Sequence, residues 1–251
     1  MKKIILIMMA SMLAMVAQAA GPSIPLDSHP GDVRDTNSLQ RGLGLYMSYC
    51  MGCHGLEYAR YNRVARDLGI PEDIFEEYLM FTDARIGDLM TIAMSAEDGR
   101  RWFGAPPPDL TLVNRVRGSD WLYTYLRGFY ADEERPFGVN NAVFENVGMP
   151  HALLELQGLC AEPLVLQRDA KIDPLSGNWL IEPGCQEYLI EGSMTPVQFD
   201  RAVADMVNFL DYMGEPFQLE RQRIGIFVLA FLFVFLFFTI LLYREYWKDA
   251  H

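Results

Sequence analysis

The chain has 251 residues, with 33 acidic and 21 basic side chains that give a formal net charge of −12. This length allows one sizeable domain of roughly 200 residues beside any targeting or membrane segment. The acidic balance argues against a nucleic-acid partner, and it suits either a basic protein partner that is steered in by charge or solubility alone.

The N-terminus has the parts of a secretory signal. A short cationic start precedes an apolar run from Ile4 to Val16, and Ala17-Gln18-Ala19 matches the small-x-small cleavage rule. We therefore expect residues 1–19 to be a signal peptide and residues 20–220 to form an exported, periplasmic domain.

The first helix is predicted to begin near Asn37 or Ser38, because apolar side chains then recur at helical spacing up to Cys50. Gly42 and Gly44 weaken a helix but let another backbone come close. The expected partner is a helix from Thr195 to Met213. It opens with an N-cap, a proline at the first helical position and the glutamine of a capping box.

The sequence CMGCH at residues 50–54 is the attachment signature of c-type haem. Cys50 and Cys53 lie on one helical turn and can each add to a haem vinyl group, and His54 then faces the iron as its proximal ligand. A redox dithiol would follow a strand, and a zinc site would need a second cysteine pair at matching spacing. We expect one covalently attached haem c.

The segment between the two helices is predicted to be rich in helix, with loops. A short acidic helix is expected over 71–81, a weakly amphipathic segment over 86–94, and an aromatic helix over 120–130 capped by Ser119 or Asp120.

The prolines at 106–108 predict a stiff, extended segment before a helix that Asp109 would cap. Pro107 and Pro108 are candidates for an apolar wall against the haem, although a plain helix lead-in is equally consistent. The haem propionates need a donor. The candidates, each of which is by default a surface residue, are Arg115, Arg117 and Trp121.

The iron needs a sixth ligand or an open site. Met149 precedes a proline, which favours an extended loop from which a thioether can be aimed. A His/Met pair raises the reduction potential. On the residues alone the alternatives stay open, and they are Met90, Met94, Met194 and His151.

Two cysteines remain after haem attachment. In an oxidising compartment Cys160 and Cys185 are expected to form a disulfide, which would stabilise the fold by about 3 kcal/mol in the chain-entropy model. Two independent buried thiols are the alternative. The enclosed stretch is rich in proline and glycine, and it contains two short β-like runs.

The segment from Ile224 to Tyr243 contains no charged residue and, at about 1.5 Å per residue, is about 30 Å long as a helix. It predicts a transmembrane anchor over residues 221–246. Arg244 and Lys248 remain on the cytoplasmic side, as the positive-inside rule prefers, with a tail at 247–251. The expected location is the cell inner membrane, with a single pass and the haem domain on the periplasmic side.

Further motifs show that the chain resembles cytochrome c1 in its bacterial form. They are CMGCH followed by YARYN at 58–62, WFGAPPPDL at 102–110, RVRG at 115–118, Met149-Pro150 and the single C-terminal span. The resemblance implies a mainly α fold: a class I c-type cytochrome with loop and short β insertions, plus one C-terminal transmembrane helix. It also implies that Met149 is the distal ligand, that His54 is the proximal ligand and that Arg117 meets a propionate.

The implied function is one-electron relay in the cytochrome bc1 complex, from a Rieske iron–sulfur protein to a cytochrome c. The chain itself catalyses no reaction. The implied partners are cytochrome b, the Rieske protein, an acceptor cytochrome c, membrane lipid and a second copy within a dimeric complex. Acidic docking residues are sought in two groups: Glu72, Asp73, Glu76 and Glu77, and Asp132, Glu133 and Glu134.

Three other functions are consistent with the same anchor and haem. The first is a monohaem cytochrome of another respiratory complex, such as a terminal oxidase or another reductase. The second is a haem enzyme with an open iron, such as a peroxidase. The third is a membrane-anchored sensor, which should carry a cytoplasmic output domain.

Overall fold

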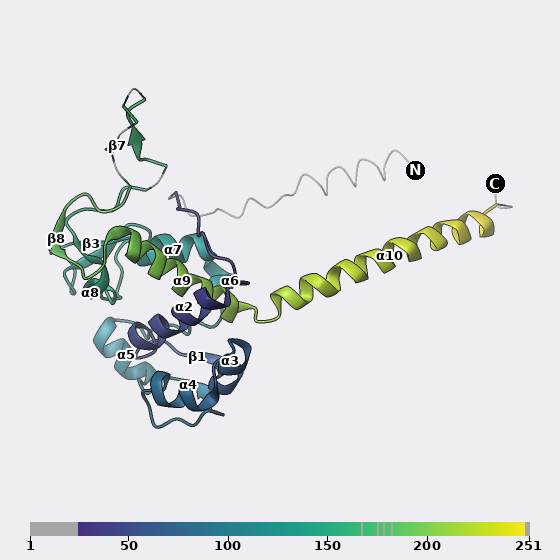
Figure 1. Cartoon of the computed structure of the whole chain (residues 1–251), viewed down its shortest axis with the longest axis horizontal. Coiled ribbons are helices and arrows are strands. Elements are labelled where there is room, and N and C mark those ends of the chain that lie inside the picture. Colours follow the sequence, from purple (N-terminus) through teal and green to yellow (C-terminus); the bar gives the residue numbers. More distant parts are fainter. Residues whose placement is uncertain (1–24, 167, 175, 178, 182, 249–251) are drawn as a thin grey trace.

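Two helices pack closely at the centre of the domain (Figure 1). The computed structural model describes residues 25–248 except 167, 175, 178 and 182, so the predicted signal peptide lies outside the described residues. Helix α2 (Thr36–Tyr49) leads into the CMGCH sequence. Helix α9 (Pro196–Gly214) begins with the predicted capping box, in which Thr195 and Gln198 bond each other's backbone.

Gly42 sets how closely these helices approach. A Cβ built on Gly42 would lie 2.1 Å from the carbonyl oxygen of Asp205 in α9, so only glycine fits there. Gly44 has open space around it, and its expected role in the contact is wrong. The Asp205 side chain accepts hydrogen bonds from Ser38 and Arg41 of α2, each over 2.6 Å.

The remaining helices are arranged around this pair. Helices α6, α7 and α8 contact α9, whereas α3, α4 and α5 lie below the pair in the view of Figure 1. Their bounds are α3 (Tyr61–Asp67), α4 (Glu72–Leu79), α5 (Ala96–Phe103), α6 (Val113–Arg117), α7 (Ser119–Arg127) and α8 (Leu154–Gln157).

The strands are short and belong to three small sheets. Strand β1 (Leu56–Arg60) pairs with β2 (Leu89–Met90). A four-stranded sheet has the order β4 (Val139–Asn141), β3 (Phe129–Ala131), β5 (Gly158–Cys160) and β8 (Tyr188–Glu191). Only β3 and β5 are parallel neighbours in it. Strands β6 (Lys171–Ile172) and β7 (Trp179–Ile181) are the two β-like runs predicted between Cys160 and Cys185.

Three local predictions are wrong for identifiable reasons. Residues 89–90 of the predicted amphipathic segment form β2, because β1 supplies a pairing partner. Helix α7 ends at Arg127 and has no side-chain cap, since the chain turns at Gly128 into β3. Asp109 caps no helix: its carboxylate accepts from the N–H groups of Glu57 (2.7 Å) and Thr111 (2.9 Å).

The extended lead-in is tied to the domain. The N–H of Asp27 donates to Thr124 Oγ1 over 2.9 Å, and its carboxylate accepts from the buried guanidinium of Arg127, also over 2.9 Å. Further along, Asn208 of α9 donates to the carbonyl of Asp32 over 2.9 Å. These bonds hold the lead-in across α7 and α9.

Helix α10 (Gln218–Tyr246) extends away from the domain (Figure 1). Among the described residues it is the one helix long and apolar enough to cross a membrane. Glu215 links the start of α10 to the domain, because its carboxylate accepts hydrogen bonds from Arg115 of α6 over 2.7 Å and from Arg221 of α10 over 3.0 Å.

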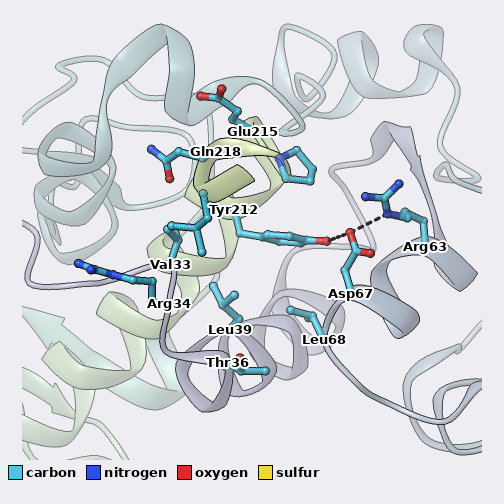
Figure 2. A pocket seen from close by; sticks show the side chains of 12 residues that line it. Val33, Arg34, Thr36, Leu39, Arg63, Asp67, Leu68, Tyr212, Glu215 and Gln218 are labelled. Carbon is cyan, nitrogen blue, oxygen red and sulfur yellow. Dashed lines mark hydrogen bonds and ion pairs between the residues drawn. The ribbon is translucent and has the colours of Figure 1, made fainter. Parts of the chain in front are cut away.

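A pocket of about 410 Å³ lies at this junction between α9 and α10. Figure 2 shows Tyr212 pointing its hydroxyl at Asp67, which also accepts from Arg63 over 2.6 Å. No residue predicted to contact the haem lines this pocket. It belongs to the base of the anchor and not to the haem site.

The contact at Gly42 makes a prediction about stability. Gly42→Ala should lower the free energy of unfolding by about 1–3 kcal/mol, because the new methyl group meets backbone atoms that cannot move aside. Gly44→Ala, in the same helix, should be neutral or stabilising by about 0.5–1 kcal/mol, since it only restricts the unfolded chain. Denaturant unfolding of the full chain in detergent, followed by circular dichroism, measures both. Equal effects of the two substitutions would contradict this account.

Candidate haem site

The attachment sequence forms a turn at the end of α2. Cys50 is the C-cap residue of α2, and its carbonyl accepts from the N–H groups of Cys53 (3.0 Å) and His54 (2.9 Å). Both thiols are free; Cys50 is buried and Cys53 is half-buried. The turn therefore brings both sulfurs and the imidazole to one end of the helix, as covalent haem attachment needs.

The His54 ring is oriented by a backbone carbonyl. Its Nδ1 lies 2.7 Å from the carbonyl oxygen of Pro108, and a carbonyl only accepts, so Nδ1 carries the proton and donates. Nε2 is then left with a lone pair for a metal. Burial lowers the pKa of His54, which favours the neutral ring that ligation requires.

The proline segment acts on the site through that carbonyl. Pro106 and Pro107 pack against Gly99 of α5, where a Cβ would lie 2.9 Å from a Pro107 side-chain atom. Pro107 is half-buried and Pro108 is exposed. The structure thus gives Pro108 a role in orienting His54, whereas the apolar wall expected of both prolines stays a prediction.

Met149 lies in a loop between β4 and α8, as predicted from the following proline. It is half-buried, and its Sδ accepts a hydrogen bond of 3.4 Å from the hydroxyl of Tyr125 in α7. Burial raises the pKa of Tyr125 to about 12. The thioether is therefore held by a donor that the sequence analysis did not identify.

The loop that carries Met149 is held by a polar network. Asn141, which is fully buried, donates to the Tyr125 carbonyl over 2.8 Å and accepts from the N–H of Val143 over 2.9 Å and from that of Phe144. The Asn140 side chain accepts from the N–H of Asn146 over 2.9 Å. Asn146 has a φ of 61°, a conformation that asparagine adopts more readily than most residues.

Three of the four alternative distal ligands make other contacts: Met90 and Met194 pack in or against the main core, and His151 stacks on an aromatic ring. Met90 is fully buried in β2, within the main core, and Met194 packs against the same core. The His151 ring stacks on Phe129 at 4.8 Å and donates through Nε2 to the Gly158 carbonyl over 3.2 Å. Burial lowers the pKa of His151 to about 4. Met94 is half-buried near Gly99.

The predicted propionate partners begin a row of side chains that runs from the end of α6 along α7 to the start of β3. The guanidinium of Arg117, which is exposed, lies 5.0 Å from the Trp121 ring, and Trp121 stacks on Tyr125 at 4.8 Å. Tyr125 in turn meets Phe129 edge-on at 5.5 Å. Arg115 bonds Glu215 at the base of the anchor, which leaves Arg117 and Trp121 as the candidates on this row.

The structure joins Cys160 and Cys185 in a disulfide, with Cα atoms 5.7 Å apart, in agreement with the expectation for the leftover pair. The bond closes the segment that contains β6 and β7 and ties it to β5.

The residues present fit a covalently attached haem. Two free thiols follow one helix, one imidazole has a free ring nitrogen, and one thioether lies in a loop with a sulfur lone pair still available. Together with the fold, this donor set defines the class of protein: a c-type cytochrome with a helix of membrane-spanning length.

Comparisons with known proteins identify the family. The model of the Cytochrome C1 family matches residues 28–250. Cytochrome c1 of Allochromatium vinosum is 47% identical over the full length of both chains. The ammonia monooxygenase gamma subunit of Nitrosomonas europaea is 42% identical, also over both full lengths. Cytochrome c1 of Rhodospirillum rubrum is 23% identical over 86% of this chain and 83% of its own.

The chain belongs to the cytochrome c1 family. It is therefore a monohaem cytochrome of the bc1 complex with covalently bound haem c, an electron-transfer subunit and not an enzyme on its own. A cytochrome b partner follows from membership of that complex.

The buried amide of Asn141 predicts how the loop is maintained. Asn141→Ala should lower the free energy of unfolding by about 2–4 kcal/mol, because it leaves the Tyr125 carbonyl and two N–H groups without partners. Asn37→Ala, at an exposed position in the first turn of α2, is the control and should change stability by less than about 0.5 kcal/mol. Thermal unfolding of the haem-loaded chain measures both. A loss no larger than that of the control would show that the amide does not hold the loop.

Proposed function

We propose that the chain relays single electrons from a Rieske iron–sulfur protein to a cytochrome c, within a quinol:cytochrome c oxidoreductase. Its haem is attached through Cys50 and Cys53 and is ligated by His54 and Met149. The observation that carries this proposal is the His54 geometry: the ring follows two free thiols, and its Nδ1 is engaged by Pro108, which leaves Nε2 for iron.

When bound, the haem supplies the one-electron couple, and the residues of the chain position and tune it. Pro108 fixes the tautomer and the ring plane of His54. The polar network around Asn141 presents the Met149 thioether from a fixed loop, which lessens the rearrangement between oxidation states. A thioether opposite an imidazole gives a higher potential than a second imidazole would.

Arg117 and Trp121 are proposed to meet the haem propionates, and Pro107 and Pro108 to pack against the haem. The support is their position. Arg117 and Trp121 lie on the row that contains Tyr125, the donor to Met149, and Pro108 contacts His54. An exposed arginine over an aromatic ring can turn toward a carboxylate at little cost.

The proposed location is the cell inner membrane, with α10 in contact with lipid, residues 1–19 removed and the haem domain on the periplasmic side. The apolar length of α10 and the basic residues that follow it support this orientation. A disulfide within the domain suits an oxidising compartment.

The proposed partners beyond cytochrome b are the Rieske protein, an acceptor cytochrome c and a second copy within a dimeric complex. The first turn of α4 carries Glu72 and Asp73, both exposed, and the exposed Glu133 and Glu134 follow β3. The two acidic groups offer landing surfaces for a basic acceptor.

Purification of the full chain from membranes in mild detergent tests the proposal. We expect cytochrome b and a Rieske protein to copurify, and the mature chain to begin at Ala20 and to weigh one haem more than its amino acids. A Cys50→Ser, Cys53→Ser variant should lose the added mass. The matched control, Cys160→Ser with Cys185→Ser, should keep it.

The same preparation separates the alternatives. Oxygenase or oxidase subunits in place of cytochrome b would overturn the proposed complex, and the name of the relative from Nitrosomonas europaea makes an ammonia monooxygenase the first to look for. A mature chain without added mass would overturn haem attachment itself.

Met149→Leu tests the distal ligand, because leucine keeps the apolar volume and removes the sulfur. The covalent haem should remain, whereas the thioether-to-iron charge-transfer band of the oxidised protein should disappear and the reduction potential should fall. Met94→Leu and Met194→Leu are matched controls that should leave both unchanged. If either control lost the band while Met149→Leu kept it, the ligand assignment would be wrong.

A further inference from the structure

The hydroxyl of Tyr125 is aimed at the sulfur of Met149. The Oη–Sδ distance is 3.4 Å, within the range of a hydrogen bond to sulfur, and the sulfur accepts. A thioether sulfur has two lone pairs, so one can bind a metal while the other accepts the hydroxyl proton. The contact is therefore compatible with Met149 acting as a ligand.

Tyr125 is held in place from several sides. Trp121 stacks on its ring at 4.8 Å with an interplanar angle of 11°, and Phe129 meets it edge-on at 5.5 Å. Its carbonyl accepts from Asn141, the amide that also orders the start of the Met149 loop. The buried Asn141 side chain thus ties the backbone of Tyr125 to the start of the Met149 loop, and the two neighbouring rings pack against the phenol.

We propose that Tyr125 is a tuning residue for the haem iron and acts through Met149. Its hydroxyl withdraws electron density from the sulfur, which weakens donation to the oxidised iron more than to the reduced iron. The reduction potential is thereby raised. This inference rests on the proposed ligation by Met149, and hydrogen bonds to ligating atoms are an established means by which proteins tune metal sites.

The test is Tyr125→Phe in the full haem-loaded chain, which deletes one oxygen atom and keeps the ring. Only the change in the strength of this hydrogen bond between the two oxidation states shifts the potential, and we take that change as about threefold to tenfold in the equilibrium constant for reduction, within the net value of one hydrogen bond. We expect the midpoint potential to fall by about 30–60 mV, at 59 mV per tenfold for one electron. The thioether-to-iron charge-transfer band should remain, because the ligand itself is retained.

Tyr123→Phe is the matched control. It removes the same atom from the same helix, at a ring that lies against His29 and Arg127 and not against Met149. The potential of this variant should equal that of the parent. An unchanged potential in Tyr125→Phe, or the same fall in both variants, would overturn the tuning role while the band still reports Met149 as the ligand. Absence of the band in the parent protein would instead overturn the ligation, and the inference with it.

A second measurement uses only the parent protein, so it does not depend on whether a variant folds. Proton electron–nuclear double resonance on the oxidised parent, in H₂O and in D₂O, should detect an exchangeable proton at the distance of a hydroxyl bonded to the ligating sulfur, in addition to the exchangeable proton on Nδ1 of His54. Spectra in which the Nδ1 proton accounts for the whole difference between the two solvents would overturn the inference.

Discussion

The contact between Gly42 and the backbone of Asp205 is the constraint on which the haem site depends. Because no side chain separates the two helices there, α2 lies close against α9 along a packed face. Leu43 and Tyr46 of α2 are fully buried in the core that this contact creates, and the Tyr46 hydroxyl donates to the His54 carbonyl. The end of α2, where the cysteines lie, is therefore held by the packing of α2 against α9 and by the bond from Tyr46 to His54.

The proposed haem ligands come from separate parts of the chain. Cys50, Cys53 and His54 follow α2 directly, and their geometry is local, apart from the single bond to Pro108. Met149 comes from a loop whose position is fixed by polar contacts to α7 and within the loop itself. The residues of the attachment motif are therefore positioned mainly by local geometry, whereas the proposed distal ligand depends on contacts that are distant in sequence.

This division explains what could be predicted from the sequence. The capping box at Thr195, the attachment turn and the pairing of Cys160 with Cys185 depend on short-range patterns or on simple counting, and the structure agrees with them. Strands β1 and β2 and the contacts of Asp109 and Asn141 were not predicted, because each depends on a partner distant in sequence. Gly42 and Gly44 lie two residues apart in the same helix, yet a Cβ would clash only at Gly42, because α9 lies against Gly42 and not against Gly44.

Tyr125 was missed for a related reason. The sequence predicts one aromatic helix over residues 120–130, and helical periodicity does not single out one of its rings. The turn at Gly128 divides that segment, so that Phe129 enters a strand while Tyr125 stays on α7 next to the Met149 loop. Four positions spaced by four residues, from Arg117 to Phe129, then form one continuous row: a cation, an indole, a phenol and a phenyl ring. Because Arg117 ends α6 and Phe129 begins β3, helical spacing alone does not predict this row, nor that the Tyr125 hydroxyl within it bonds the sulfur of Met149.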